Sequence, residues 1–150
     1  MKKLQQIKFI SHPVSVLITG IRYGRNAKPF LDAGMNVVGI EISHIAIDLA
    51  HSTMGLDVTI HYGSVSDMPF DNQMYESIFC YGLIHLLDET HREKLIKDCY
   101  TQLAPGGYTI FIAIATKSPL YGKGMEISPG RLEQHGGAQI FFYDEVHRVS

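Results

Sequence analysis

The chain has 150 residues, of which 45% are hydrophobic and 19% are charged, and its formal net charge is −2. This length and apolar content suit one buried core, so we expect a single domain over residues 1–150. Acids and bases are spread along the chain without the basic stripe that nucleic-acid binding requires, so we expect no nucleic-acid partner.

No segment of the sequence predicts export or membrane insertion. Residues 1–13 lack the uninterrupted apolar core of a signal peptide, and no apolar stretch approaches the roughly 20 residues that span a bilayer. Cys80 and Cys99 fall in elements with apolar patterns, which makes a disulfide framework implausible. We therefore expect a cytoplasmic protein with no membrane partner.

The first half of the chain alternates between strand-like apolar runs and helical periodicity. A strand over 14–19 is followed by a loop with a glycine at each end and then by a helix over 26–33, which Gly34 would end. A second strand over 36–41 leads into a helix that Ser43 would cap.

The next strands are predicted over 57–62 and 75–81, and the second of these is rich in β-forming residues. An amphipathic helix follows over 89–103, and Pro105 would stop it. The run 108–115 is apolar enough to be a central strand covered on both faces.

The last part of the chain changes character. Residues 116–137 contain five glycines and two prolines, so we expect no regular element there, and loops of this length are typically lids or binding loops. An apolar run returns over 140–143, and Asp144 could cap a last helix. With five strands and their helical crossovers, the pattern predicts an α/β fold with a doubly wound, mostly parallel Rossmann-like sheet.

In such a sheet, ligands bind beyond the carboxyl ends of the strands, next to the loop after the first strand. That loop reads Gly20-Ile21-Arg22-Tyr23-Gly24, and Glu41 lies 21 residues beyond Gly20 at the tip of the second strand. A carboxylate at this offset accepts hydrogen bonds from ribose hydroxyls. The pattern favours a nucleotide site, but the glycines could also serve only a tight turn, with Glu41 as a solvated strand end.

Four segments occur in an informative order: residues 16–26 read VLITGIRYGRN, 39–43 read GIEIS, 63–87 begin GSVSDMPFDNQMYESIF, and 103–107 read LAPGG. They resemble the first motif VLDLGCGxGRN, the acidic strand end, the GDxxDLPFxDxxFDxI segment and the LKPGG turn of class I S-adenosylmethionine-dependent methyltransferases. Within that family the chain is similar to the type 11/12 group, which acts on small molecules. The ordered set is far more specific than any one motif.

The resemblance implies S-adenosyl-L-methionine as the cofactor and a small-molecule methyl acceptor. The backbone of 20–24 would pass under the methionine part of the cofactor, and Glu41 would hold the ribose. Ile42, Ser64 and Val65 would lie beside the adenine. The full set of cofactor-binding residues that it implies is Thr19, Gly20, Ile21, Arg22, Gly24, Asn26, Glu41, Ile42, Ser64, Val65 and Cys80.

Two residues near the end of the fourth strand are catalytic candidates. Methyl transfer is an in-line displacement, so an enzyme contributes mainly by holding acceptor and methyl group in near-attack geometry. Tyr81 matches the segment that borders the acceptor. His85 could deprotonate the acceptor, since an unperturbed pKa of about 6.5 suits a general base, but it could also cap or pack. The histidines show no HExxH or CxxC spacing, so we expect no metal site.

Three positions depart from the family pattern. Ile18 stands where the family usually has an acid, Arg22 replaces the middle glycine, and Ser64 replaces an aspartate. They leave open a catalytically inactive module that binds the cofactor weakly or not at all, so whether the chain is an enzyme stays open. A short-chain dehydrogenase-like NAD(P) site on Thr19 and Gly20 is a further alternative, against which stands the absence of a YxxxK pair.

Family members also commonly carry an N-terminal helical extension and two further strands. If the chain lacks the final strands, one edge of the sheet is unpaired, and an unpaired edge favours self-association. We therefore expect a homodimer or a covered edge.

Overall fold

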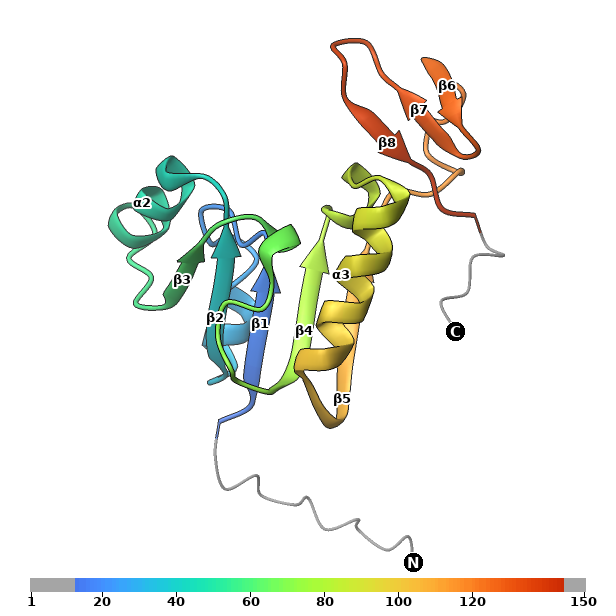
Figure 1. The fold of residues 1–150 in the computed structure, drawn as a ribbon. Helices are drawn as coiled ribbons and strands as arrows, with labels where there is room; N and C mark the ends of the chain where they lie inside the picture. Colours follow the sequence, from blue (N-terminus) through green and yellow to red (C-terminus); the bar gives the residue numbers. More distant parts are fainter. Residues whose placement is uncertain (1–12, 145–150) are drawn as a thin grey trace, which may run out of the picture.

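The computed structural model describes residues 13–144 and is built around a five-stranded parallel sheet (Figure 1). Its strands are β1 Ser15–Thr19, β2 Asn36–Glu41, β3 Thr59–Tyr62, β4 Tyr75–Tyr81 and β5 Leu103–Ile112. The strand order is β3-β2-β1-β4-β5, so the direction of winding reverses between β1 and β4. This order confirms the predicted doubly wound α/β fold and places a ligand-binding crevice at the carboxyl ends of β1 and β4.

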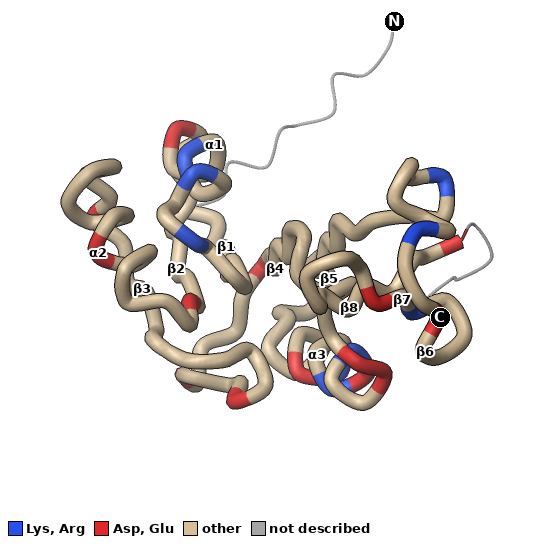
Figure 2. The backbone as a smooth tube through the Cα atoms, turned by 90° about the horizontal axis from the view of Figure 1, so that it is seen from above, with Lys and Arg blue, Asp and Glu red and all other residues tan. Residues whose placement is uncertain are grey.

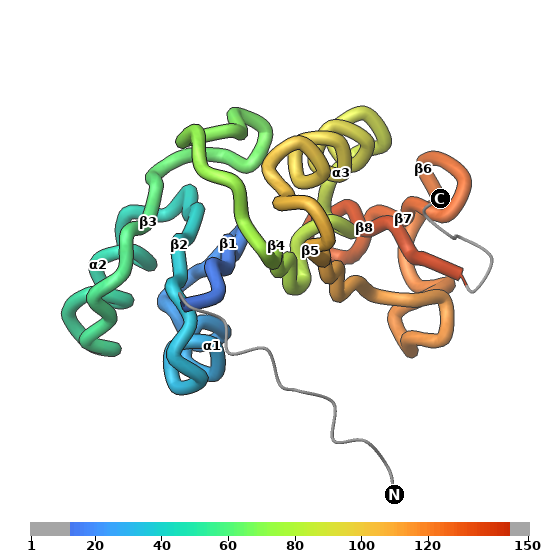
Figure 3. The backbone as a smooth tube through the Cα atoms, turned by 90° about the horizontal axis from the view of Figure 1, so that it is seen from below, coloured from blue at the N-terminus to red at the C-terminus, as the bar shows by residue number. Residues whose placement is uncertain are grey.

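Helices cover both faces of the sheet, with α1 and α2 on one face and α3 on the other (Figure 2 and Figure 3). The predicted cap of α2 is confirmed, because the Ser43 hydroxyl accepts a hydrogen bond from the Ala46 amide at 3.2 Å. Asp88 caps α3 in the same way, accepting from the His91 amide at 2.8 Å. The helices are α1 Lys28–Asp32, α2 His44–Ser52 and α3 Glu89–Gln102, with short 3-10 helices η1 Val65–Asp67 and η2 Ile84–Leu86.

The core consists of two layers separated by the sheet. On the α3 face, Leu17 and Ile78 of the sheet share a buried cluster with Leu95 of the helix. On the α1 face, Val16 and Ile18 lie in a second buried cluster. Successive residues of β1 therefore enter opposite layers, as the alternation of side chains along a strand requires.

The prediction that the run 108–115 is a central strand covered on both faces is wrong for the described residues. β5 is the edge strand of the sheet, and Tyr108, Ile110 and Ile112 on one of its faces are 75%, 46% and 42% exposed. Composition predicts a β-strand but cannot predict which neighbours will cover it. β5 also begins earlier than expected, because Leu103 pairs with Tyr75 before a register shift.

The prediction of no regular element over 116–137 is also wrong. β6 Met125–Ser128 and β7 Arg131–Glu133 form an antiparallel sheet with β8 Gln139–Phe141. Gly130 lies in the turn between β6 and β7 with φ +76°, a conformation that glycine adopts without strain. The glycines thus mark the turns of a small sheet, which stands beyond the carboxyl ends of the main strands and contacts η2 through β8 (Figure 1).

Two expectations lie outside the described residues: the lack of a signal peptide in the first residues of the chain, and a helix after Asp144. Within residues 13–144, no helix is both long and apolar enough to cross a membrane. The same part of the chain holds no group of three or more His, Cys, Asp or Glu side chains placed to bind a metal ion.

Candidate functional site

The loop after β1 is held against β2 by its backbone. Gly20 has φ +69°, and the amides of Gly20 and Ile21 both donate to the Ile40 carbonyl, at 2.9 and 3.0 Å. The side chain of Ile21 is fully buried and packs over Gly39, where a Cβ atom would lie 2.7 Å from it. The absence of a side chain at Gly39 therefore lets the loop lie close to the sheet.

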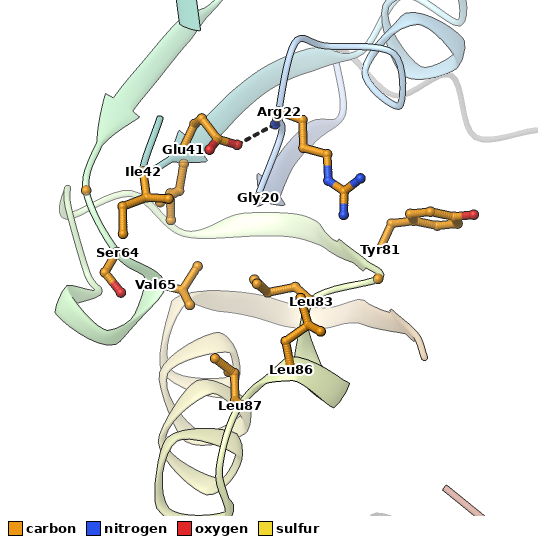
Figure 4. A pocket seen from close by; sticks show the side chains of 13 residues that line it. Gly20, Arg22, Glu41, Ile42, Ser64, Val65, Tyr81, Leu83, Leu86 and Leu87 are labelled. Atoms are coloured by element: carbon orange, nitrogen blue, oxygen red, sulfur yellow. Dashed lines mark hydrogen bonds between the residues drawn. The ribbon is translucent and has the colours of Figure 1, made fainter. Parts of the chain in front are cut away.

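The carboxylate of Glu41, at the tip of β2, is only 7% exposed and is fixed by two backbone amides (Figure 4). Its Oε2 accepts from the Arg22 amide at 2.6 Å, and its Oε1 accepts from the Ser43 amide at 3.0 Å. A carboxylate can accept about four hydrogen bonds, so Glu41 retains acceptor capacity for a ligand. Its orientation is set before any ligand arrives.

A cavity of about 260 Å³ lies at the carboxyl ends of β1, β2 and β4 (Figure 4). Val65, Leu83, Leu86 and Leu87 give it apolar walls, while Glu41 supplies a carboxylate. Such an arrangement suits a flat ring held between aliphatic side chains and joined to a group with hydroxyls. Its lining residues are Gly20, Arg22, Ile40, Glu41, Ile42, Gly63, Ser64, Val65, Tyr81, Gly82, Leu83, Leu86 and Leu87.

Arg22 enters one end of this cavity. It is the one non-glycine residue with positive φ among those the structure describes, at φ +55°. Its side chain extends toward Tyr81 (Figure 4), and its Nη2 atom lies 3.9 Å from the position that a Cβ atom of Gly82 would take. The guanidinium therefore lies at one end of the cavity and leaves the space between Glu41 and the leucines open.

His85 lies in η2, between lining residues of the cavity along the chain, but does not line the cavity itself. Its Nδ1 accepts a hydrogen bond from the Ile114 amide at 3.3 Å, which places the proton of a neutral ring on Nε2. Burial lowers the pKa of His85 below its usual value, and the positive charge of Arg22 lowers it further. The ring is accordingly neutral near pH 7, and its role as a general base stays a prediction.

Seven of the thirteen sequence-predicted site residues line the cavity together: Gly20, Arg22, Glu41, Ile42, Ser64, Val65 and Tyr81. The other six do not line it. Thr19, Ile21 and Cys80 are fully buried. Gly24 packs so closely against Leu56 that a Cβ atom at Gly24 would overlap the leucine side chain. Asn26 borders a neighbouring cavity, and the sixth is His85.

Several lining residues were missed by reasoning from the sequence. Leu83, Leu86 and Leu87 form the apolar wall, and Gly63 lines the cavity just after β3. The apolar run after β4 was a usable signal for the leucines, because a chain that leaves a strand at the crevice lines the crevice.

Comparisons with known proteins agree on one family. A family model described as a methyltransferase domain matches residues 16–107. An uncharacterized methyltransferase of Anoxybacillus flavithermus (strain DSM 21510 / WK1) is 31% identical over 96 residues, which span 64% of this chain and 45% of that relative. The chain therefore spans about half the length of this relative.

Solved structures share the fold. The glycopeptide N-methyltransferase MtfA matches with a TM-score of 0.62 and 22% identity, over 75% of this chain and 51% of that one. The CcbJ methyltransferase from Streptomyces caelestis matches with a TM-score of 0.70 and 18% identity, over 86% of this chain and 66% of that one. MtfA has also been crystallised in complex with S-adenosyl-L-methionine.

Proposed function

The chain belongs to the methyltransferase-domain family, in the class I S-adenosylmethionine-dependent group, and from this membership we propose that it binds S-adenosyl-L-methionine in the cavity beside Glu41 and transfers its methyl group to a small molecule. The observation that carries the proposal is the carboxylate of Glu41, which two backbone amides hold in a fixed orientation at the edge of the apolar cavity. Because the family model covers the segment with Thr19 and Gly20, the alternative of a short-chain dehydrogenase-like NAD(P) site has no remaining support.

The nucleoside end of the cofactor suits the residues present. Glu41 can accept hydrogen bonds from the ribose hydroxyls while it keeps its two backbone donors. Val65, Leu86 and Leu87 offer apolar surface to the adenine ring. The hydroxyl of Ser64 accepts a hydrogen bond from the Ser66 amide at 3.1 Å, so part of its hydrogen-bonding capacity is already used within the protein.

The other end of the cavity is unusual for a ligand with a positive sulfonium. When bound, S-adenosyl-L-methionine supplies an electrophilic methyl group on that sulfonium. Ile18, at the position where the family usually has an acid, is 1% exposed and belongs to the α1-face core, so it offers the cofactor no charge. Arg22 instead brings a guanidinium to this end, where it can pair with the carboxylate of the amino-acid part.

Transfer to the acceptor requires little chemistry from the protein. The acceptor atom would attack the methyl carbon as the carbon–sulfur bond breaks with its electron pair on sulfur, and the acceptor's proton would pass to solvent or a base. Tyr81 ends β4 at this cavity and Gly82 follows it, and the small sheet of β6, β7 and β8 stands beyond the carboxyl ends of the main strands, in contact with η2 (Figure 1). We assign these elements to positioning and covering the acceptor, a contribution that acts through orientation.

A specific observation also supports a second candidate, an inactive module of the same fold. The Arg22 guanidinium occupies the end of the cavity where the family pattern has a glycine, and it would repel a sulfonium. In that case the protein would bind the neutral product S-adenosylhomocysteine, or no nucleoside, and would transfer no methyl group.

Isothermal titration calorimetry with S-adenosylhomocysteine and S-adenosyl-L-methionine tests the proposal. We expect saturable binding of both ligands, followed by methyl transfer when candidate acceptors are screened with a labelled methyl group. No heat and no thermal shift with either ligand at about 1 mM, the range of weak affinities, would refute cofactor binding. Binding without transfer to any acceptor would favour the inactive module.

A further inference from the structure

A side chain of α3 holds the backbone of the segment that forms the apolar wall of the cavity beside Glu41. Nη1 of Arg92 donates a 2.9 Å hydrogen bond to the Leu87 carbonyl, while the side chain of Leu87 lines the cavity. Arg92 itself does not line that cavity. The position of Leu87, and with it part of the cavity wall, therefore depends on a residue outside the cavity.

The same guanidinium also contacts the small sheet of β6, β7 and β8. Cζ of Arg92 lies over the Phe141 ring, 3.8 Å from its centroid, which is within the range of a cation–π contact. Phe141 belongs to β8 and is nearly buried, and its ring packs edge-on against Tyr143 at 4.9 Å between centroids. A cation–π contact is stronger where its partners are shielded from water, so this pair contributes more than an exposed pair would.

A cavity of about 300 Å³ separates the start of α3 from part of the small sheet. Glu89 and Arg92 line it from the helix, and Arg131 and Phe141 line it from the sheet. Within residues 13–144, no ion pair joins Glu89 to Arg131. The guanidinium of Arg92 therefore supplies a contact between α3 and the small sheet at a place where the two elements are not closely packed.

We propose that Arg92 is a positioning residue that couples the small sheet to the wall of the cavity beside Glu41. Its planar guanidinium is rigid, so the nitrogen that binds Leu87 and the face that contacts Phe141 cannot shift independently. A displaced small sheet would loosen the wall, and a ligand that fixes the wall would stabilise the sheet, because such a coupling is reciprocal. The effect on the acceptor rests on the proposed function, whereas the coupling of Leu87 to Phe141 does not.

Hydrogen exchange of single amides, followed by NMR on the full chain without a ligand, tests the coupling. The Leu87 amide donates to Ile84 at 3.2 Å and reports on the wall, and the Phe142 amide donates to Gly130 at 2.8 Å and reports on the small sheet. Arg92→Met keeps the apolar stem and removes both contacts. We expect exchange at both amides to rise about three- to tenfold, the scale of one cation–π contact. Arg92→Lys keeps a cation and a donor and should restore part of the protection.

Matched variants separate the coupling from a general loss of stability. Lys97→Met removes an exposed cation of the same helix and should change exchange at neither amide. Phe141→Leu removes the contacted ring and should raise exchange at Leu87 as well as in the small sheet. Phe142→Leu removes the next ring along the chain, which packs against Tyr121 at 5.3 Å between centroids, and should raise exchange in the small sheet alone.

S-adenosylhomocysteine then separates this inference from the proposed function. When the nucleoside binds, it should slow exchange of the Phe142 amide in the unmodified chain but not in Arg92→Met at equal saturation. Binding that leaves this amide unchanged, or slows it equally in both proteins, would overturn the coupling. A rise in exchange confined to the small sheet in Arg92→Met would also overturn it. If the nucleoside fails to bind while the Leu87 and Phe142 amides still respond together to Arg92→Met, the coupling stands and the methyltransferase role fails.

Discussion

The backbone amide of Arg22 donates a 2.6 Å hydrogen bond to Oε2 of Glu41, and this bond joins the loop after β1 to the tip of β2. The same carboxylate receives the Ser43 amide on its other oxygen, just before α2 begins. One nearly buried acid therefore fixes two backbone segments of the cavity and also presents the group that a ribose would meet. Its contribution to binding cannot be separated from its contribution to the shape of the site.

Glu41→Gln should weaken S-adenosylhomocysteine binding by about tenfold or more. The amide keeps the size of the side chain but turns one acceptor into a donor that faces a backbone N–H, and hydrogen bonds to charged groups contribute roughly 1.5–3 kcal/mol. Calorimetry on the variant measures the loss. Glu93→Gln, an exposed acid of α3, is the matched control and should bind as the unmodified protein does.

Most of the main sheet could be predicted from the sequence because local signals and long-range packing agree there. The strand over 36–41 and the Ser43 cap are found as expected, since a short apolar run and a capping hydroxyl are local properties. Exposure of β5 and pairing of β6 with β7 depend on which distant segments meet, and single-sequence patterns do not contain that information.

Only part of the candidate site could be predicted from the sequence. Glu41, Ser64 and Val65 follow from ordered motifs and line the cavity, while their contact with the cofactor stays a prediction. Thr19 and Cys80 belong to matching motif positions, but they pair with each other inside the sheet and are fully buried. A motif locates a segment at the crevice, whereas the pleat of each strand decides which of its side chains face the ligand.

His85 should titrate below the usual value for histidine, and Arg22→Gln should raise its pKa. Burial disfavours the charged imidazolium, and the nearby guanidinium repels it, so removing the guanidinium removes the second cause. An NMR titration of the ring protons measures the pKa of His85 in the unmodified protein and in Arg22→Gln. Lys97→Gln should leave the pKa in place, and an unchanged value in Arg22→Gln would show that the two charges do not interact.

Tyr75→Phe should lower the free energy of unfolding by roughly 1.5–3 kcal/mol, the range for a hydrogen bond to a charged group. The fully buried Tyr75 hydroxyl donates to Oδ2 of Asp71 at 2.5 Å. That carboxylate also accepts from His61 and Gln102, each at 3.1 Å, so the network ties β3, β4 and α3 together. Urea unfolding measures the change.

Tyr100→Phe is the matched control for this network, because Tyr100 is 79% exposed on α3. It should change the free energy of unfolding by less than about 0.5 kcal/mol, as surface substitutions usually do. Equal losses in the two variants would mean that the buried hydroxyl contributes nothing specific to stability.

The exposed face of β5 leads us to expect a homodimer. Ile110 and Ile112 are 46% and 42% exposed on the edge strand, and Tyr108 beside them is 75% exposed. Covering one such aliphatic side chain contributes roughly 1.5–3 kcal/mol when it goes from fully exposed to buried, and a two-fold interface counts each side chain twice.

Ile110→Lys should therefore shift the chain toward the monomer, because a lysine ammonium inside the interface would have to be desolvated in both copies. Sedimentation velocity over a range of concentrations measures the equilibrium for the unmodified chain and for the variant. Tyr100→Lys adds the same charge on α3, on the opposite face of the sheet, and should leave the equilibrium unchanged. A monomer at every concentration of the unmodified chain would contradict the dimer, and the exposed face of β5 would then need another partner.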